Sequence, residues 1–302
     1  MDRVLVIRKP PGLTSHDVVE RIRRSSRERR VGHAGTLDPS ATGLLLVLVG
    51  RATRLAQFLA DAEKEYRGHM LLGRITDTQD LTGRVLEERP CDGVTRERVE
   101  RAFEGFTGHI QQVPPMVSAL KHQGTPLYAL ARKGITVERA PRSVLVRRLG
   151  LLAFDPPDVE FEVVCSKGTY VRTLAADVGE VLGCGACLGE LERRRIGRFT
   201  MDAALALGDV EALGRDVAVF GCSMFDALAD LPSLTVDGNE AALLATGGSI
   251  RVSPERVQAA PGGHVRVTRN GAELLAVGRV DAAPHGGPGD AAIHPIRVFE
   301  EV

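Results

Sequence analysis

Apolar residues in the first two thirds of the chain follow two patterns, namely continuous or alternating runs and runs with helical spacing. Runs of the first kind predict strands at residues 2–7, 44–49, 64–73, 143–154 and 159–166. Helical spacing predicts helices that begin near Ser15, near Thr95 and shortly after Arg172. This part of the chain is therefore predicted to contain both strands and helices.

The first of these helices should have one apolar face and one strongly basic face. Ser15 is a suitable N-cap, and Val18, Val19 and Ile22 follow it at helical spacing. The opposite face carries six arginines within ten residues: Arg21, Arg23, Arg24, Arg27, Arg29 and Arg30. So dense a group exceeds what solvation of a helix requires and is typical of contact with phosphate. A merely solvated face is the alternative interpretation.

A glycine-rich loop, residues 32–43, separates this helix from the apolar strand at 44–49. Three glycines and a proline within twelve residues exclude a regular helix or strand, because glycine is unfavourable in both and proline lacks an amide donor. Loops held against a buried strand commonly present catalytic groups, and Asp38 is the acidic residue of this loop. Two interpretations stay open: Asp38 either hydrogen-bonds its own backbone in a tight turn or serves chemistry.

Residues 113–142 differ in character from the sequence around them. They begin with an irregular, proline-rich stretch and continue with a small polar segment that includes Lys121. Basic residues surround a short predicted helix: Arg132, Lys133, Arg139 and Arg142. We interpret the segment as an insertion that stands away from the core and is basic enough to close over an anion. A plain surface excursion is the alternative.

Two later segments carry further candidate residues. The first, residues 166–172, reads SKGTYVR. If it is extended, Tyr170 and Arg172 point to the same side, because side chains alternate along a strand. The second, residues 191–199, is dense in arginine and predicts another strand.

The composition and hydrophobic pattern of the sequence change near Pro232. Beyond it, glycine pairs separate short alternating runs at residues 265–268, 274–280 and 293–298. We therefore expect two domains, residues 1–234 and residues 235–302, of which the second is small and mostly β. A unit of about 70 residues buries a marginal core, so we expect it to lean on the larger domain.

Composition narrows the class of protein. The chain has 302 residues, 43% hydrophobic and 26% charged, which is ordinary for a soluble globular protein. Its formal net charge is zero, so a nucleic acid would have to be met by a local basic face. No segment approaches the roughly 20 apolar residues of a membrane span, and the N-terminal apolar run is too short for a signal peptide. We expect a cytoplasmic protein with no membrane partner.

The sequence offers little support for a metal or redox site. Five scattered cysteines indicate a reducing compartment. Cys184 and Cys187 form a C-x-x-C pair, but no second Cys/His pair accompanies them. Asp77, Asp80 and Gly83 predict a structural turn, because the spacing of an EF-hand calcium loop is absent.

Six motifs occur in one order over residues 1 to about 200. They are Lys9-Pro10-x-Gly12-x-Thr14-Ser15, Gly32-His33-x-Gly35-x-Leu37-Asp38-Pro39-x-Ala41-Thr42-Gly43, Lys64-x-Tyr66 with Gly73, Ser118-Ala119-Leu120-Lys121, Ser166-Lys167-Gly168-Thr169-Tyr170-x-Arg172, and Leu191-x-Arg193 before Gly197 and Phe199. In these motifs the chain resembles the TruB family of tRNA pseudouridine synthases. One departure is Glu192, which stands where the family motif has arginine. The C-terminal part resembles a PUA-type RNA-binding domain more loosely, by size and position.

The resemblance implies an α+β fold with a mixed, mostly antiparallel sheet, followed by a small β-rich, PUA-like domain. It also implies a reaction, the isomerisation of uridine to pseudouridine at position 55 in the T loop of tRNA. The N1–C1′ bond breaks, the base rotates, and C5 bonds to C1′, so no cofactor or metal is needed. By resemblance Asp38 is the essential carboxylate, through a covalent or a glycal-type path, and an aspartate nucleophile would divide one difficult step into easier ones.

The resemblance further assigns roles to residues around Asp38. Arg172 pairs with Asp38 and keeps it ionised. Tyr66 stacks on the flipped base and is a candidate for proton transfer, although an unperturbed phenol is a weak base at neutral pH. His33 assists flipping, and Tyr170 and Leu191 line the pocket.

Lysines and the insertion complete the expected RNA site. Lys9 and Lys167 support the site or contact phosphate, and Lys121 binds substrate from within the insertion. The insertion at residues 113–142 grips the T stem-loop, as in stand-alone bacterial members, which argues against a guide-RNA-dependent relative. The sequence does not specify the oligomeric state, and we expect by default a monomer that requires no protein partner.

Two other classes of protein remain as alternatives. A non-catalytic RNA-binding protein could use the same basic face, but it would not need a carboxylate facing an arginine. A hydrolase with an aspartate nucleophile would normally place a second carboxylate or a metal nearby, and the sequence shows no convincing partner for Asp38.

Overall fold

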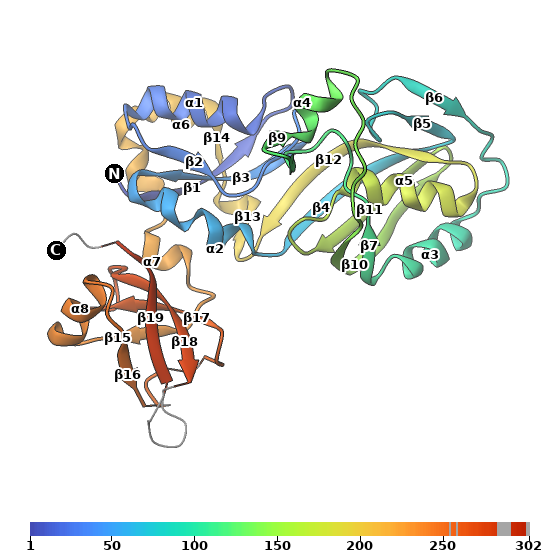
Figure 1. Cartoon of the computed structure of the whole chain (residues 1–302). Helices are drawn as coiled ribbons and strands as arrows, with labels where there is room; N and C mark the ends of the chain where they lie inside the picture. The colour runs from blue at the N-terminus through green and yellow to red at the C-terminus, as the bar shows by residue number, and fades with distance from the viewer. Residues whose placement is uncertain (254, 258, 283–290, 300–302) are drawn as a thin grey trace.

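The computed structural model describes residues 1–253, 255–257, 259–282 and 291–299. Over these ranges the chain forms a large ten-stranded sheet and a separate five-stranded sheet. Figure 1 shows the large sheet as an elongated body, with the C-terminal sheet below its N-terminal end. None of the helices in the described ranges is both long enough and apolar enough to cross a bilayer.

The large sheet is mixed and mostly antiparallel, as expected. Its main order is β14–β1–β3–β12–β4–β11–β10–β7, with β2 beside β3 and β13 beside β12. The strands are β1 (Arg3–Lys9), β2 (Val31–His33), β3 (Thr42–Val49), β4 (Lys64–Leu72), β7 (Gly108–Gln112), β10 (Arg142–Asp155), β11 (Asp158–Cys165), β12 (Ala186–Ile196), β13 (Phe199–Thr200) and β14 (Leu205–Ala206). Within the described residues, only the pairs β1–β14 and β3–β12 of this sheet are parallel. The parallel pair β3–β12 brings the end of the glycine loop beside Glu192 and Arg193.

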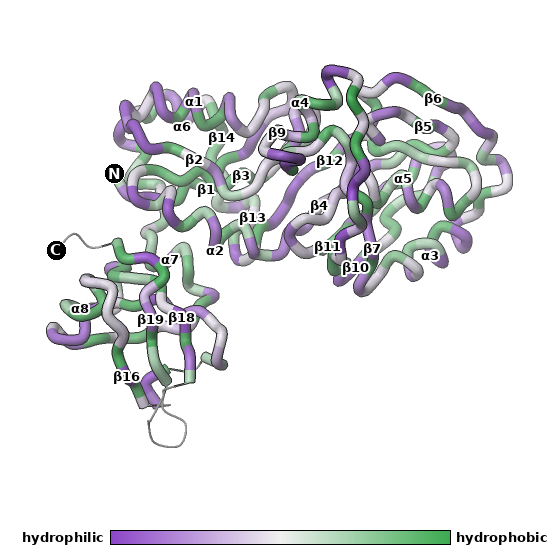
Figure 2. Tube along the Cα trace, in the orientation of Figure 1, coloured by the Kyte–Doolittle hydropathy of each residue, from purple (hydrophilic) through white to green (hydrophobic). Residues whose placement is uncertain are grey.

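Helices and short 3-10 turns flank the sheet. They are α1 (Ser15–Ser26), η1 (Gly50–Leu55), α2 (Ala56–Ala60), α3 (Arg96–Gly105), α5 (Val171–Leu182), η2 (Met201–Ala203), α6 (Leu207–Leu213), η3 (Gly214–Phe220) and α7 (Met224–Ala227). Apolar residues of α3 and α5, among them Phe103 and Leu174, share one core with Phe161 of β11. Residues of α1 and α6, among them Val18 and Val210, pack on β1 and β3. Figure 2 shows the amphipathic character of α1 as alternating purple and green along its length.

Thr14, and not Ser15, is the N-cap of α1. The Thr14 side chain accepts a hydrogen bond from the backbone N–H of Asp17, and the Asp17 carboxylate accepts one from the Thr14 N–H. This reciprocal capping box satisfies two amide donors at the start of the helix. Ser15 is thereby free for another contact, which it makes with the glycine loop.

Two small excursions leave the large sheet. One is the hairpin β5 (Arg74–Thr76) and β6 (Val85–Glu88). The other is the insertion, which contains the hairpin β8 (Lys121–His122) and β9 (Thr125–Pro126) and the one-turn helix α4 (Leu127–Ala131). In Figure 1 the insertion stands above the middle of the sheet, next to the glycine loop.

The C-terminal sheet has its own apolar core and also shares one with the larger body. Its order is β15 (Ser233–Thr235), β17 (His264–Thr268), β18 (Ala276–Ala282), β19 (Ala291–Val298) and β16 (Ile250–Val252), with α8 (Gly238–Ala245) beside it. Leu234, Val267 and Ile293 belong to its inner core. Val277 and Phe299 instead join an apolar cluster that includes residues of η1 and α7.

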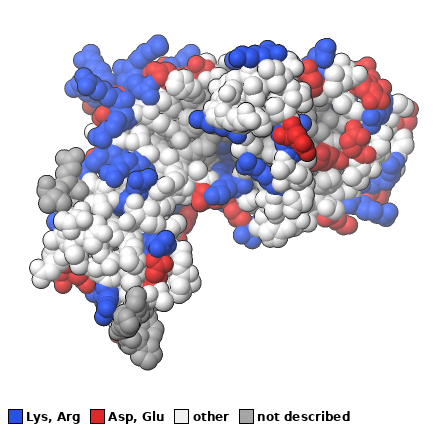
Figure 3. Space-filling view, in the orientation of Figure 1, with Lys and Arg blue, Asp and Glu red and all other residues white. Residues whose placement is uncertain are grey.

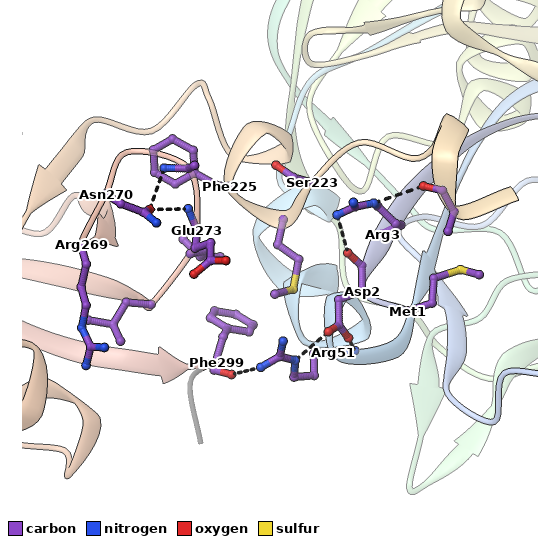
Figure 4. A pocket seen from close by; sticks show the side chains of 15 residues that line it. Met1, Asp2, Arg3, Arg51, Ser223, Phe225, Arg269, Asn270, Glu273 and Phe299 are labelled. Atoms are coloured by element: carbon purple, nitrogen blue, oxygen red, sulfur yellow. Dashed lines mark hydrogen bonds and ion pairs between the residues drawn. The ribbon is translucent and has the colours of Figure 1, made fainter. Parts of the chain in front are cut away.

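A cavity of about 710 Å³ lies between the two sheets. Figure 4 shows Arg51 between Phe299 and Asp2 in the wall of this cavity. Arg51 Nε donates to Asp2 Oδ2 at 2.8 Å, and its Nη1 donates to the Phe299 carbonyl at 2.7 Å. On the side of the cavity where Asp2 lies, Arg3 Nε donates to the Ala218 carbonyl at 3.2 Å (Figure 4). Arg51 therefore links the N-terminal segment to the end of the C-terminal sheet.

Candidate active site

A second cavity, of about 560 Å³, opens where the glycine loop, β4, β12, the base of the insertion and the start of α5 meet. Six of the residues singled out from the sequence line it: Asp38, Tyr66, Lys167, Tyr170, Arg172 and Leu191. They come from four segments that lie far apart in the chain, namely the glycine loop, β4, residues 167–172 and β12. The fold therefore brings together most of the expected site, and we call this cavity the Asp38 pocket.

The Asp38 carboxylate is held by Arg172. Arg172 Nε donates to Asp38 Oδ2 at 2.8 Å, and Arg172 Nη2 lies 3.4 Å from Asp38 Oδ1. Arg172 is 4% exposed, whereas the Asp38 side chain is 40% exposed. The carboxylate is thus anchored from the protein side and open on the pocket side. The turn interpretation, in which the Asp38 side chain bonds its own backbone, is wrong.

Arg172 lies on a helix. The sequence analysis had considered residues 166–172 as an extended segment with alternating side chains, and that interpretation is wrong at Arg172. Tyr170 is the N-cap of α5, and Val171 begins the helix. The Gln112 side chain fixes this start, because it accepts from the Tyr170 N–H at 2.8 Å and donates to the Tyr170 carbonyl at 3.1 Å. Tyr170 and Arg172 both line the pocket, but the helix start places them there.

Sequence reasoning missed Asp80, a second carboxylate beside Arg172. Asp80 Oδ2 lies 3.8 Å from Arg172 Nε, and the Asp80 side chain is 10% exposed. Its Oδ1 accepts hydrogen bonds from the Thr78 hydroxyl and from the N–H and hydroxyl of Thr82. These bonds commit Asp80 to the turn and to Arg172, so it is not a free second carboxylate of the kind that a hydrolase needs.

Two backbone carbonyls complete the surroundings of Arg172. Its Nη1 donates to the Thr78 carbonyl at 2.9 Å, and its Nη2 donates to the Val117 carbonyl at 2.8 Å. A buried guanidinium needs partners for its five N–H groups, and here they come from three separate segments. Arg172 therefore connects the turn at Asp80 and the base of the insertion to Asp38 in the glycine loop.

Ser15 and Lys9 support the glycine loop from below. The Ser15 hydroxyl accepts from the Leu37 N–H at 2.8 Å and donates to the Leu37 carbonyl at 3.1 Å. Lys9 Nζ donates to the carbonyls of Pro10, Leu13 and Pro39, at 2.9, 2.6 and 3.2 Å. Both contacts fix the backbone on either side of Asp38.

The expectation that Lys9 binds substrate is wrong. The side chain is 0% exposed, and backbone carbonyls accept from all three of its N–H groups. Burial lowers the pKa of Lys9 to about 8. Lys9 supports the loop, which was the other role expected for it, and it cannot reach a phosphate.

Arg193 is a second buried guanidinium under the loop. It is 1% exposed and donates to the carbonyls of Leu44, Thr36 and Gly35, at 2.8, 3.2 and 3.2 Å. Gly43 passes close over the Arg193 backbone with a positive φ of 98°, and a β-carbon at this position would collide with it. The glycine therefore permits the close pairing of β3 with β12.

Tyr66 forms part of the pocket floor. It lies on β4 between Val163 of β11 and Arg193 of β12, and it is 9% exposed. Burial raises the pKa of the Tyr66 phenol, while the Arg193 guanidinium opposes that rise. The phenol is therefore neutral at physiological pH and offers a ring and a hydroxyl to the cavity.

Three of the expected binding residues lie elsewhere or at the rim. His33 lies on β2 outside the pocket wall; its Nδ1 is buried without a hydrogen-bond partner among the described residues, and burial lowers its pKa. Lys121 is exposed on β8 and also lies outside the wall. Lys167 lies in the wall but is exposed, and its Nζ forms an ion pair with Asp61 at 2.6 Å.

Basic side chains gather at the far end of α1. In Figure 3, Lys and Arg atoms cover this end of the helix, at the upper left of the molecule. Four exposed arginines there, Arg24, Arg27, Arg29 and Arg30, form no ion pair in the described part of the chain. The other end of α1 contacts the glycine loop through the hydrogen bond between Ser15 and Leu37. We call these four residues the α1 arginine cluster.

The sequence matches two protein-family models. The model for "TruB family pseudouridylate synthase (N terminal domain)" matches residues 23–171, and the model for "tRNA pseudouridylate synthase B C-terminal domain" matches residues 172–216. A tRNA pseudouridine synthase B of Aromatoleum aromaticum is 43% identical over 306 residues, covering 100% of this chain and 94% of the relative. One from Moorella thermoacetica is 43% identical over 285 residues and covers 92% and 93%. The chain belongs to the TruB family.

Solved structures agree with this TruB assignment. A chain of the "Crystal Structure of a Cbf5-Nop10-Gar1 Complex" superimposes with a TM-score of 0.78 at 27% identity, covering 99% of this chain and 85% of that one. A chain of the "Structure of H/ACA RNP bound to a substrate RNA containing 2'-deoxyuridine" gives a TM-score of 0.74 at 25% identity, with coverage of 99% and 85%. The expected α+β fold with an added C-terminal β domain is confirmed.

The cysteines of this TruB chain are all free thiols. Cys184 and Cys187 are 2% and 0% exposed, and burial raises the pKa of both. Within the described ranges, no group of three or more His, Cys, Asp or Glu side chains is placed to hold a metal ion.

Proposed function

We propose that this TruB-family chain isomerises the uridine at position 55 in the T loop of tRNA to pseudouridine, with Asp38 as the essential carboxylate. The observation that carries the proposal is the Asp38 pocket itself. It presents a carboxylate that is oriented by Arg172 and open to the cavity, above a buried aromatic ring. Relatives that share 43% identity over nearly the whole chain are named tRNA pseudouridine synthase B, which supports uridine isomerisation in tRNA.

The reaction requires neither oxidation nor an added group. The N1–C1′ bond breaks, the uracil turns in place, C5 bonds to C1′, and the proton on C5 is exchanged for one on N1. Two paths fit a fixed carboxylate: Asp38 attacks C1′ and is later displaced, or it removes the C2′ proton to give a glycal. In both paths Arg172 keeps Asp38 ionised and aimed.

A uridine inside a folded loop has to leave its stack to reach this carboxylate. Flipping costs a few kcal/mol, and stacking on an aromatic ring returns roughly 1–3 kcal/mol. Tyr66 supplies that ring on the pocket floor, and Leu191 and Tyr170 form walls beside it. His33, on the loop strand next to the pocket, assists the displacement of the nucleotide.

Phosphate contacts lie outside the pocket. The α1 arginine cluster and the insertion at residues 113–142, with Lys121 on its hairpin, bind the RNA backbone on two sides of the site. We assign residues 1–234 to catalysis and residues 235–302 to a PUA-like RNA-binding domain. We also propose a monomer that needs no protein partner and acts in the cytoplasm.

Tritium release tests the proposal directly. A T stem-loop RNA labelled at uridine C5 is incubated with wild type and with Asp38→Asn, in excess EDTA. We expect release by wild type and none by the variant, while RNA affinity stays within about tenfold because phosphate contacts dominate binding. Tight binding without release by wild type would indicate a non-catalytic RNA-binding protein. Release that stops in EDTA would indicate metal-dependent chemistry.

A further inference from the structure

Ser118 carries a buried hydroxyl that has no hydrogen-bond partner within the described part of the chain. The residue is 6% exposed, and its Oγ is buried. Buried hydroxyls are nearly always hydrogen-bonded, because an unmet donor in a dry site is unfavourable. Ser118 also lines the Asp38 pocket. The Ser118 hydroxyl is therefore placed to donate to a molecule that enters the cavity.

The backbone around this hydroxyl is firmly placed. The Ser118 N–H donates to the Met116 carbonyl at 3.0 Å, and the Ser118 carbonyl accepts from the Tyr128 N–H at 3.1 Å. The preceding carbonyl, that of Val117, accepts from Arg172 Nη2, and the same nitrogen contacts Asp38. One guanidinium therefore fixes both the essential carboxylate and the segment that presents the hydroxyl.

The Tyr170 phenol also lines the Asp38 pocket and is close enough to the Ser118 hydroxyl to influence its own ionisation. The contact with Ser118 lowers the pKa of Tyr170 and offsets part of the rise that burial causes. No hydrogen bond of normal geometry joins the two hydroxyl groups. The Ser118 O–H is therefore not committed to Tyr170 and remains available to a molecule in the cavity.

Uracil carries hydrogen-bond acceptors that the Ser118 hydroxyl could donate to. A flipped uracil that stacks on Tyr66 exposes two carbonyl oxygens, O2 and O4, on the edge that base pairing would otherwise use. We propose that the Ser118 hydroxyl donates a hydrogen bond to one of these two carbonyl oxygens of the flipped uracil. The inference rests on the proposed function, since it needs a uridine in the Asp38 pocket. It makes the first residues of the insertion part of base recognition as well as of RNA binding.

The test compares three stem-loop RNAs that carry uridine, 2-thiouridine or 4-thiouridine at the target position. Sulfur accepts hydrogen bonds weakly, so a thio substitution removes most of the contact at that atom. Ser118→Ala should lower kcat/KM on uridine about tenfold, the size expected for losing one hydrogen bond to a buried group. On the thio substrate whose sulfur replaces the bound oxygen, the same variant should lose less than about threefold. The arm that shows this reduced loss identifies O2 or O4.

Two further variants separate hydrogen bonding from packing. Ser118→Cys keeps nearly the same volume but has a weak S–H donor, so it should behave like Ser118→Ala. Ser233→Ala removes an exposed hydroxyl on β15, outside the Asp38 pocket, and should change kcat/KM less than about twofold.

The outcomes divide clearly. An equal loss by Ser118→Ala on all three RNAs, or full activity of Ser118→Ala or Ser118→Cys on uridine, would overturn the Ser118 contact and leave the proposed function standing. A wild type that releases no tritium from the uridine stem-loop would overturn the proposed function, and the Ser118 contact with it.

Discussion

Arg172 contacts both carboxylate oxygens of Asp38, with Nε 2.8 Å from Oδ2 and Nη2 3.4 Å from Oδ1. A planar guanidinium can do this and still donate to two further carbonyls, whereas an ammonium group cannot. We predict that Arg172→Lys lowers the single-turnover rate about 100-fold, because small misplacement of a reacting group has an effect of that order. RNA affinity should change less than tenfold. Arg96→Lys, in an exposed helix pair with Glu100, is the control.

The measurement is single-turnover tritium release together with a binding isotherm for the same RNA. Near-normal release by Arg172→Lys would show that charge alone suffices and that the two-point contact is dispensable. A parallel loss of affinity would instead place Arg172 among the RNA-binding residues.

Asp80 should affect the reaction rate indirectly, because it helps to hold Arg172 in place. Its carboxylate lies 3.8 Å from Arg172 Nε, and the turn that carries it also supplies the Thr78 carbonyl. We predict that Asp80→Asn lowers the rate about tenfold without changing RNA affinity, because the amide keeps an oxygen for the Thr82 contacts but loses the charge that holds Arg172. Asp77→Asn, in the same turn but exposed, should have little effect. The double variant Asp80→Asn with Arg172→Lys should lose less than the product of the two single losses. Strictly multiplicative losses would mean that Asp80 acts independently of Arg172.

The sequence could predict elements and motif positions better than the contacts between them. Strands 44–49 and 159–166 appear as expected because long apolar runs determine buried strands. The alternation argument for residues 166–172 was wrong because Gln112, 58 residues away in the chain, fixes the start of a helix at Tyr170. Nothing local in the segment indicates that contact.

The same limit explains why Asp80 was missed and why Lys9 was expected to contact phosphate. Asp80 looks like an ordinary turn residue, and only the fold brings Arg172 beside it. Lys9 looks like a surface lysine at a Pro-Pro-Gly turn, but its ammonium is enclosed by the Pro10 and Leu13 carbonyls of that turn and by the Pro39 carbonyl of the glycine loop. The pairing of Asp38 with Arg172 was expected from the family resemblance, because 134 residues separate the two in the chain.

Ser15 offers a test of how far rigidity of the loop matters. Ser15→Ala leaves the buried Leu37 N–H and carbonyl without this partner, which should lower the free energy of unfolding by about 1–3 kcal/mol. It should also lower the single-turnover rate, since Asp38 is the next residue. Ser25→Ala, on the same helix, removes only a 3.3 Å bond to the Ile22 carbonyl and is the control. Urea unfolding and tritium release measure the two effects. A stability loss without a rate loss would show that Asp38 does not depend on the Leu37 anchor.

The buried ammonium of Lys9 predicts a specific pH dependence of stability. Burial lowers its pKa to about 8, against 10.5 for an ordinary lysine. Between these values the unfolded chain binds a proton at Lys9 that the folded chain has released, so the free energy of unfolding should rise with pH there. The contribution of one group is at most about 1.4 kcal/mol per pH unit. Urea titrations at pH 7, 8, 9 and 10 should therefore give a steeper rise for wild type than for Lys9→Met. Parallel curves would contradict the lowered pKa.

The α1 arginine cluster should contribute affinity and salt dependence rather than chemistry. Arg29 and Arg30 are exposed, form no ion pair within the described ranges, and follow the C-terminal end of α1, whereas Ser15 at its other end contacts the glycine loop. If both contact phosphates, replacing them with glutamine should reduce the slope of log K against log salt by about 1–2 and weaken binding to full-length tRNA, with kcat unchanged.

The matched control is Arg96→Gln with Arg101→Gln on α3, at the other end of the sheet in Figure 1. Binding isotherms between 50 and 200 mM salt cover the range over which such contacts weaken by orders of magnitude. Equal slopes for the two double variants would show that the cluster is only a solvated face.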